Sequence, residues 1–311
     1  FAGNLTATCV VHKATETWLM QGNSPENFSL FRMSESVGNP APLSLALAEM
    51  PFAVDQQAIR TVALWCSAKG PMMTEGSVLL PMRFQQPDGA ISSVDAYFRP
   101  TEQDSRGVNA AAFEAIRGWY DPQWSEYNML LPSGTGQFQN TAWLVCDLRR
   151  RKWYKKVPVA YPQMVIPVED STGKTYAYGG VDTGHLLRLE HGTTWDGTAL
   201  QHVVDTADIP YHENVWDVTR LRYLKMLARV ETGVAAALTC AHAADGSGAF
   251  ITTATLPLVG GTGRYAKVTQ PVNLLALTHQ LRVSVTTSDK QRAPQLLGLG
   301  TAFIVERQEL S

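Results

Sequence analysis

Acidic residues in the middle of the chain are the first candidates for chemistry: Asp121, Glu126, Asp182 and Glu190. A glycoside hydrolase needs two carboxyl groups that face each other across a cleft, because one donates a proton while the other activates water or attacks the sugar. No spacing among these residues selects such a pair. The chain also has no GxSxG, GxxxxGK[ST] or HExxH motif. We therefore predict that the protein is not an enzyme and has no catalytic residue.

Histidines gather between residues 185 and 212, and acidic residues lie beside them. A metal site needs such side chains to converge at about 2 Å from the ion in a closed geometry. The spacing matches no recognised ligand pattern. We interpret the histidines as scattered turn and surface residues, and predict neither a metal ion nor a cofactor. The residues are His185, His191, His202 and His212, with Asp182, Glu190 and Asp196 nearby.

A basic run covers Arg149–Lys152 and continues at Lys155 and Lys156. Such a run can contact phosphate or an acidic partner surface. Like charges clustered around one tryptophan, Trp153, are more often the solvated tip of a hairpin. No aromatic stacking platform accompanies the run as in single-strand binders, so nucleic-acid readout is not predicted.

The segment Arg188-Leu-Glu190-His-Gly192-Thr-Thr194-Trp195 is close to the Asp-box turn of sialidase-type propellers, Ser-x-Asp-x-Gly-x-Thr-Trp. Here Arg replaces Ser and Glu replaces Asp. Even a true Asp box closes a blade hairpin and does not cleave glycans. We favour a plain glycine turn with Trp195 in the core.

Composition indicates a globular protein with a large core. The chain has 311 residues, of which 45% are hydrophobic and 17% charged, and its net charge of -2 gives no overall basic field that recruits nucleic acid. Cys9, Cys66, Cys146 and Cys240 lie far apart, so we expect free thiols rather than a disulfide framework. The apolar run at 234–244 is too short for a membrane segment. The chain opens at Phe1 without a charged leader, and we expect no signal peptide and a fragment or processed chain.

The elements that must position these residues are predicted to be strands. Residues 115–157 indicate three strands joined by two hairpins, a meander of the kind that forms a propeller blade. Similar units recur near 18–33, 59–82 and 175–192, which predicts a partial or irregular β-propeller over 1–192, incomplete at its N-terminal side. Within it, LSLALAEM after residue 42 indicates a short helix or an irregular crossing, and 104–115 indicates a short helix that begins near Asn109.

Residues 193–311 indicate a linker and a second all-β domain. LRVSVTT alternates, with Leu281, Val283 and Val285 on one face. About six strands separated by turns every 10–15 residues are typical of a β-sandwich. VTRLRYLKMLARVE also has helical spacing, but we predict a strand because its surroundings are β.

The order of these segments resembles the propeller of bacteriophage tail nozzle or hub proteins, over roughly residues 18–311. In that family a W-S-x-x-G-P strand precedes a Y-D-P-x-x-x-E-Y hairpin and a V-x-D/N-x-x-x-x-x-W hairpin. The segment YGGVDTGHLLRLEHGTTWDGTAL resembles the family's passage into a C-terminal β-sandwich. The matching residues are Trp65, Ser67, Gly70, Pro71, Tyr120, Asp121, Pro122, Glu126, Tyr127, Val145, Asp147 and Trp153.

The resemblance implies a structural role in the virion tail. Six copies would form a ring at the end of a short tail, DNA would pass through its lumen without sequence-specific binding, and fibres or an adaptor would dock outside. Such a ring repeats one heterologous interface until it closes. A lumen that releases DNA should lack a strong basic lining, so we expect Arg149–Lys156 away from the channel or in a subunit contact.

Two alternatives remain open. One is a glycan-binding or glycan-cleaving propeller in which an arginine cluster converges on paired acids. The other is a receptor-binding or fibre-docking module of the same virion with exposed aromatic residues, although we favour core or subunit-interface positions for all of them. The arginines are Arg99, Arg117, Arg188 and Arg264, and the aromatic residues are Trp119, Trp124, Tyr127 and Trp195.

Overall fold

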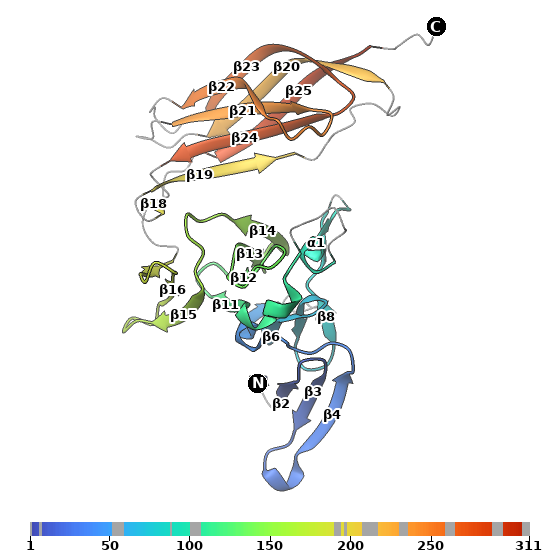
Figure 1. Cartoon of the computed structure of the whole chain (residues 1–311), viewed down its shortest axis with the longest axis vertical. Helices are drawn as coiled ribbons and strands as arrows, with labels where there is room; N and C mark the ends of the chain where they lie inside the picture. Colours follow the sequence, from blue (N-terminus) through green and yellow to red (C-terminus); the bar gives the residue numbers. More distant parts are fainter. Residues whose placement is uncertain are drawn as a thin grey trace. The chain divides into compact units, whose positions relative to one another are not determined.

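The described part of the chain folds mostly as β-strands with little helix in a computed structural model, which confirms the all-β prediction. Its contacts divide it into two compact units, Phe1–His191 and Gly192–Ser311 (Figure 1). None of the helices in the described part of the chain is long and apolar enough to span a membrane. The structure describes residues 2–5, 8–51, 59–87, 89–99, 107–189, 194–195, 198–206, 217–229, 236–258, 265–287 and 295–306.

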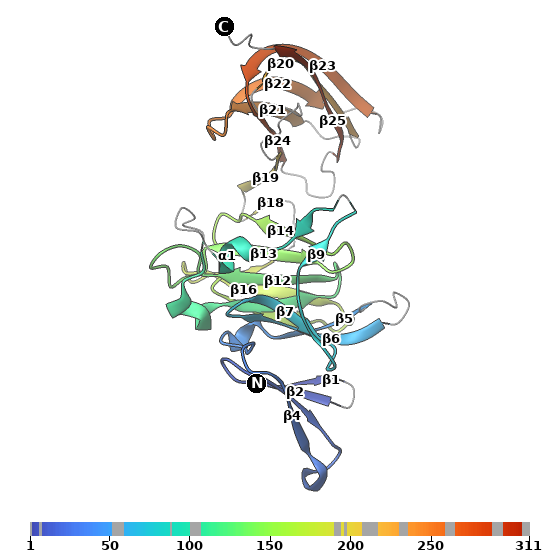
Figure 2. The same cartoon turned by 90° about the vertical axis from the view of Figure 1, so that its right-hand side faces the viewer.

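The first unit begins with two antiparallel meanders, in which each strand pairs with the one before it in the chain. In both views the hairpin of β3 and β4 extends beyond the other sheets of this unit (Figures 1 and 2). Sheet 1 consists of β1 (Ala2–Leu5), β2 (Thr8–His12), β3 (Thr17–Gln21) and β4 (Ser29–Ser34). Sheet 2 consists of β5 (Ala46–Pro51), β6 (Ile59–Ser67), β7 (Gly70–Thr74) and β8 (Leu79–Pro81).

Sheet 3 has four strands, whereas the sequence predicted three over this stretch. The additional strand follows the basic turn, because Oδ1 of Asp147 accepts hydrogen bonds from the backbone N–H groups of Arg149 and Arg150 and so reverses the chain. The strands are β11 (Arg117–Asp121), β12 (Glu126–Leu131), β13 (Ala142–Asp147) and β14 (Lys152–Lys156).

Sheet 4 has three strands, β15 (Met164–Glu169), β16 (Thr175–Gly180) and β17 (Leu186–Arg188). A ribbon of β9 (Phe84–Gln85) and β10 (Ile91–Ser92) lies beside β14, since the backbone N–H of Trp153 donates to Oγ of Ser92. The short helices of this unit are η1 (Pro25–Asn27), η2 (Pro42–Ser44), α1 (Asp95–Phe98) and η3 (Ala110–Ala115).

Two helix predictions need correction. Over 104–115 the described helix is only the 3-10 turn η3, because Ala112 leaves helical geometry (φ -121°) although Asn109 caps the first turn as expected. The part of that prediction between 104 and 106 lies outside the described residues. The segment after residue 42 forms η2 and then β5, since pairing with β6 outweighs the helix propensity of its Leu and Ala residues.

Successive sheets of the first unit pack on one another. Val10 and Leu19 of sheet 1 share a core with Trp65 of sheet 2. The opposite face of sheet 2 joins sheet 3 in a larger core, where Leu64 packs in one cluster with Met129. Sheet 4 then contacts sheet 3, because β11 touches β15 and β16. The order of packing thus follows the order of the chain.

The second unit has two sheets around one core. Sheet 5 pairs β18 (Thr194–Trp195), β19 (Thr198–Asp205), β24 (His279–Thr287), β21 (Ala236–Ala244) and β22 (Ile251–Leu258) in that order. Sheet 6 pairs β23 (Tyr265–Ala276), β20 (Val218–Arg229) and β25 (Gln295–Glu306). Leu221 and Leu224 from sheet 6 are buried in one cluster with Leu281 and Val283 from sheet 5. The strand predictions for LRVSVTT and for VTRLRYLKMLARVE are confirmed.

Candidate functional site

The last sheet of the first unit has two unlike faces. Ala177 and Leu189 lie on its inner face and are buried. On the outer face, Met164 is 53% exposed, Ile166 is 53% exposed and Leu186 is 69% exposed. Apolar side chains on a sheet face are normally covered by another layer. Here the described residues leave them open to solvent.

The register explains why these side chains share one face, since directly paired residues of neighbouring strands point the same way. Ile166 pairs with Tyr178, and Tyr178 pairs with Arg188. The guanidinium carbon of Arg188 lies 3.6 Å from the ring centroid of Tyr176, a cation–π contact. We define the outer face of sheet 4 as Met164, Ile166, Val168, Tyr176, Tyr178, Leu186 and Arg188.

This surface is suited to packing rather than to chemistry. It combines aliphatic and aromatic side chains with one cation held flat on a ring. Monomeric proteins rarely expose large contiguous apolar patches, and those that do usually bind another macromolecule there. Both faces of sheet 3 carry buried residues, such as Met129 on one and Trp143 on the other. The outer face of sheet 4 is therefore the face, at the end of the stack of sheets 1 to 4, that no described layer covers.

Sheet 1 carries a second aromatic surface on the side away from sheet 2. Nζ of Lys13 lies 5.4 Å and the guanidinium carbon of Arg32 lies 5.6 Å from the ring centroid of Trp18. The indole N–H of Trp18 donates to Glu16. Leu30 lies two residues before Arg32 on β4, on the same face, and is 59% exposed. This face is smaller and more polar than the outer face of sheet 4.

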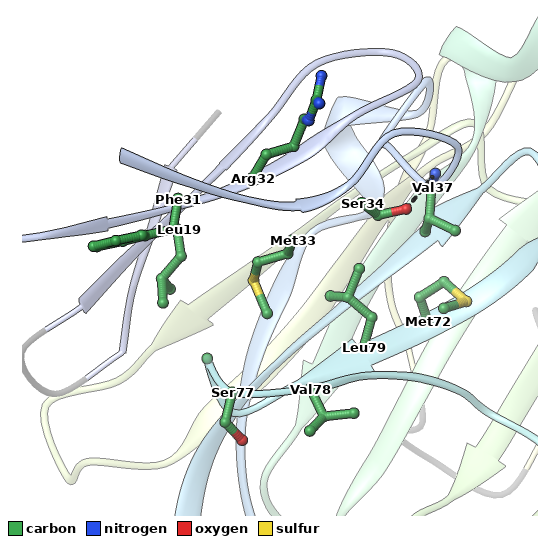
Figure 3. Close-up of a pocket in the computed structure, with 11 residues that line it drawn as sticks. Leu19, Phe31, Arg32, Met33, Ser34, Val37, Met72, Ser77, Val78 and Leu79 are labelled. Carbon is green, nitrogen blue, oxygen red and sulfur yellow. Dashed lines mark hydrogen bonds between the residues drawn. The ribbon is translucent and has the colours of Figure 1, made fainter. Parts of the chain in front are cut away.

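A groove of about 580 Å³ lies between sheets 1 and 2. Figure 3 shows Met33 and Leu79 pointing into it from β4 and β8. Arg32 is the one charged residue among its described lining residues, and it is paired with Glu35. The described lining residues accept apolar groups but include no carboxylate, histidine or cysteine. Its lining consists of Leu19, Phe31, Arg32, Met33, Ser34, Val37, Met72, Gly76, Ser77, Val78 and Leu79.

The predicted acids do not face a common cleft among the described residues. Asp121 and Glu126 are paired across the β11–β12 hairpin. Asp121 accepts from the backbone N–H of Gln123, while Glu126 bonds the hydroxyl of Tyr154 and the ammonium group of Lys156. Asp182 is an exposed residue of a turn in sheet 4. Glu190 lies outside the described residues.

The histidine prediction can be followed at one position. His185 is exposed in the turn before β17, as expected. Within the described residues, no three His, Cys, Asp or Glu side chains are placed to hold a metal ion. His191, His212 and Asp196 lie outside the described residues, and His202 belongs to β19 without a described side chain.

The basic run is a solvated hairpin tip, as predicted. Arg149 and Lys152 are exposed, and Arg150 pairs with Asp147 through Nη1 at 3.1 Å. Nε of Arg149 donates to Oγ of Ser125, which follows an exposed tryptophan in the neighbouring turn. Lys156 is not part of the tip, because it bonds Glu126 and lies over the ring of Trp143 at 5.2 Å.

The predicted arginine cluster does not form among the described residues. Arg99 is exposed after α1. Arg117 donates to the carbonyl oxygens of Glu114 and Ile116, and partial burial lowers its pKa. Arg188 stacks on Tyr176 as described above, and Arg264 lies outside the described residues.

The aromatic residues divide between the core and the surface. Trp119 is buried with its ring 5.5 Å from that of Trp143, and Tyr127 is fully buried with its hydroxyl donating to the carbonyl oxygen of Ser44. Trp124 does not lie in the core of this chain, because it is 50% exposed at the tip of the β11–β12 hairpin. The alternative prediction, a subunit interface, stays a prediction. The side chain of Trp195 is outside the described part.

Buried histidines are the polar feature that sequence reasoning missed. His12 packs against Trp65 with ring centroids 4.5 Å apart, and burial lowers its pKa to about 4. In the second unit, Nε2 of His242 lies 2.8 Å from Nδ1 of His279, and Nε2 of His279 lies 3.0 Å from Oγ1 of Thr219. Burial lowers the pKa of both members of this pair. Only His242, between Ala241 and Ala243, has apolar neighbours on both sides in the sequence, so a sequence signal existed for one of the three.

The four cysteines are free thiols, as expected. Cys66, Cys146 and Cys240 are buried, and burial raises the pKa of each. A thiol whose ionisation is suppressed is a poor nucleophile. These residues fill the core and supply no reactive group.

Comparisons with known proteins assign no family. No protein-family model matches the chain, and no curated protein matches it. An exo-β-1,3-galactanase from Phanerochaete chrysosporium is similar at 10% identity and a TM-score of 0.20, over 97% of this chain and 95% of that one. An arabinoxylan arabinofuranohydrolase of glycoside hydrolase family 43 from Bacillus subtilis is similar at 9% identity and a TM-score of 0.24, over 96% and 65%. Likenesses this weak carry no argument about this chain.

Proposed function

We propose that the protein is a structural subunit of a bacteriophage tail, part of a nozzle or hub ring. The observation that carries the proposal is the uncovered outer face of sheet 4, where Ile166 and Leu186 are exposed at the end of a stack of packed sheets. A surface of this kind gains free energy when a neighbouring subunit covers it, at about 25 cal/mol per Å² of apolar area removed from water. The assignment to a bacteriophage tail comes from the sequence resemblance.

In this proposal the first unit is a partial β-propeller and the second is a β-sandwich. Support for the propeller comes from four consecutive meanders that pack in chain order, each on the next. Support for the sandwich comes from two sheets whose inner residues form one cluster. The hairpins that carry the resemblance pair Tyr120 with Tyr127 and Cys146 with Trp153.

The ring has one heterologous contact repeated to closure, with six copies as in nozzle-type proteins. The outer face of sheet 4 of one copy packs on an apolar face of the next. DNA passes through the lumen without sequence-specific binding, and an adaptor and fibres dock outside. The exposed tip at Arg149 and Lys152 lies away from the channel, where its charge does not retain DNA.

The role is structural rather than catalytic. Two of the four candidate acids of a glycosidase are already engaged, since Glu126 bonds Tyr154 and Lys156 and Asp121 closes a turn. A receptor-binding or fibre-docking module of the virion is the second candidate. The observation in its favour is Trp124, which is 50% exposed at a hairpin tip.

Negative-stain imaging and light scattering of the purified chain test the proposal. We expect closed rings of several copies with a central channel, and a mass that is a multiple of 34.1 kDa. A single species at 34.1 kDa over a wide range of protein concentration contradicts the ring. Hydrolysis of an aryl glycoside by that species would instead support the glycan-cleaving alternative.

A further inference from the structure

The outer face of sheet 6, in the second unit, is strongly basic. Burial alternates along β20, so that Leu224 and Met226 are buried while Lys225 and Arg229 are exposed. Lys267 on β23 is exposed and pairs with Leu227, which places it on the same face between the other two cations. Cations on diagonal positions of neighbouring strands are about 7–8 Å apart.

The described strands of sheet 6 carry five cations and one acid. The described residues of β20, β23 and β25 contain Arg220, Arg222, Lys225, Arg229 and Lys267, whereas Glu306, the last residue of β25, is the one acid. No carboxylate of a described residue forms a salt bridge with Lys225, Arg229 or Lys267. The field is therefore local, because the chain as a whole has a net charge of -2.

Aromatic rings and glycines complete the face. Tyr223 is 46% exposed and pairs with Pro271, and Tyr265 is 70% exposed and pairs with Arg229. Gly298 and Gly300 on β25 pair with Leu227 and Lys225, so that β25 adds no side-chain bulk there. The result is a flat basic surface with two rings and a shallow strip beside the cations.

We propose that this face binds single-stranded nucleic acid. A phosphodiester backbone offers hydrogen-bond acceptors and negative charge, and lysine and arginine supply only donors and positive charge. Sugar hydroxyls also donate, so a polysaccharide site needs carboxylate or amide acceptors, which are scarce here. Bases of a single strand stack on exposed rings, whereas a duplex keeps its bases covered. The inference goes beyond the proposed function and does not depend on it.

The basic turn of sheet 3 is the competing site, since it has Trp124 nearby. Two of its cations are already engaged, because Arg150 pairs with Asp147 and Arg149 bonds Ser125. Lys225, Arg229 and Lys267 have no such partners among the described residues, and they stand on strands, whereas Arg149 and Arg150 belong to a turn. Nucleic acid should therefore favour sheet 6.

Fluorescence anisotropy of the full-length protein with a labelled 20-mer of thymidylate tests the proposal. The triple variant K225A/R229A/K267A should weaken binding by at least about tenfold and reduce the salt slope by about 2, near 0.7 for each lost phosphate contact. The variant R149A/K152A/K155A removes the same charge from the basic turn of sheet 3 and the following strand β14, and should bind within about twofold of the parent. Loss of binding in that variant instead would overturn the assignment.

Further variants separate stacking and charge from unfolding. Tyr265→Leu keeps an apolar side chain but removes the ring, and should weaken binding by about tenfold. Gly300→Glu brings a carboxylate beside Lys225 without a clash, because a Cβ there meets the Cβ of Lys225 at 3.6 Å. It should reduce binding while the melting temperature stays unchanged. Unchanged affinity in both variants would overturn the proposal.

A comparison of different anionic polymers completes the binding experiment. The thymidylate strand should bind more tightly than a duplex of equal length, and more tightly than alginate, a carboxylated polysaccharide, at equal charge concentration. Tighter binding of alginate or of the duplex would overturn the assignment of a single strand. Absence of binding at low salt would overturn the site itself.

Discussion

The two units solve the same problem, how to cover the faces of β-sheets, in different ways. In the first unit each sheet uses strands that follow one another in the chain, and each packs on the next. In the second unit the strands of the two sheets interleave, so that β20 pairs with β23 and β25 while β19 pairs with β24. Two sheets that face each other cover each other's apolar faces. In a stack built in chain order, the outer face of the last sheet remains uncovered.

The exposed side chains follow from this difference. The outer face of sheet 4, at the end of the stack, remains apolar, with Ile166 53% exposed. The outer face of sheet 6 covers a core that is already complete, and it carries cations such as Lys225. An exposed apolar face is stabilised when another layer covers it, whereas a basic face is stable in water and can bind an anionic partner. The comparison agrees with the two proposals, assembly through the first unit and ligand binding by the second.

The largest expected effect tests whether the two cores are independent. Trp143→Ala removes a fully buried ring from sheet 3 and should cost about 3–5 kcal/mol in the first unit. Leu224→Ala removes a fully buried side chain from sheet 6 and should cost about 2–5 kcal/mol in the second unit. Calorimetry should show a separate transition lowered by each variant. One shared transition that both variants lower equally would break the comparison.

Acid should weaken the first unit through His12. Burial lowers the pKa of His12 from 6.5 to about 4, so below pH 6.5 the unfolded chain binds a proton that the folded chain excludes. Stability is therefore complete above about pH 6.5 and falls by about 3 kcal/mol as the pH drops to 4. Urea unfolding at several pH values measures this slope, and His12→Phe should remove it.

The second unit should lose stability in the same direction, because burial also lowers the pKa of His242 and of His279. The His12→Phe variant should leave that slope untouched, which makes the second unit its internal control. A pH slope in the first unit that survives the substitution would contradict the assignment to His12.

A smaller effect probes the bonds between neighbouring sheets. The hydroxyl of Tyr127 in sheet 3 donates to the carbonyl oxygen of Ser44, just before sheet 2, at 2.8 Å. Tyr127→Phe leaves that carbonyl without this donor and should cost about 1 kcal/mol, read from the denaturant midpoint. Tyr154→Phe is the matched control on the same sheet, because its hydroxyl is at the surface beside Glu126 and its loss should cost less. Equal effects of both variants would show that the bond between sheets adds nothing.

The sequence predicted most strands correctly, but it missed one strand and suggested two helices where the structure has a strand and a 3-10 turn. Alternation identified β24, where Leu281 and Val283 are buried, and β context correctly outweighed the helical spacing of β20. The fourth strand of sheet 3 was missed because charged residues surround Trp153, which is buried by contacts from distant segments such as the carbonyl oxygen of Met82. Local propensity favoured helices near Ala46 and Ala112, and strand pairing or a broken turn replaced them.

The candidate surfaces could not be predicted from the sequence. Met164, Ile166 and Val168 alternate as any half-buried strand does, and only the packing of Ala177 and Leu189 shows which face remains open. The pair of His242 and His279 joins positions 37 residues apart through strand register. Trp124 was predicted to lie in the core or in a subunit interface, and its 50% exposure excludes only the core, because the exposure of a hairpin tip depends on what the rest of the chain leaves uncovered.

The central claim is that the outer face of sheet 4 is completed by another subunit. The most direct measurement compares the mass in solution of Ile166→Asp with that of Ile251→Asp, a matched control at the exposed start of β22 in the second unit. The account predicts that the parent protein and Ile251→Asp form closed rings while Ile166→Asp remains a folded single chain of 34.1 kDa. Rings formed equally well by Ile166→Asp would contradict it.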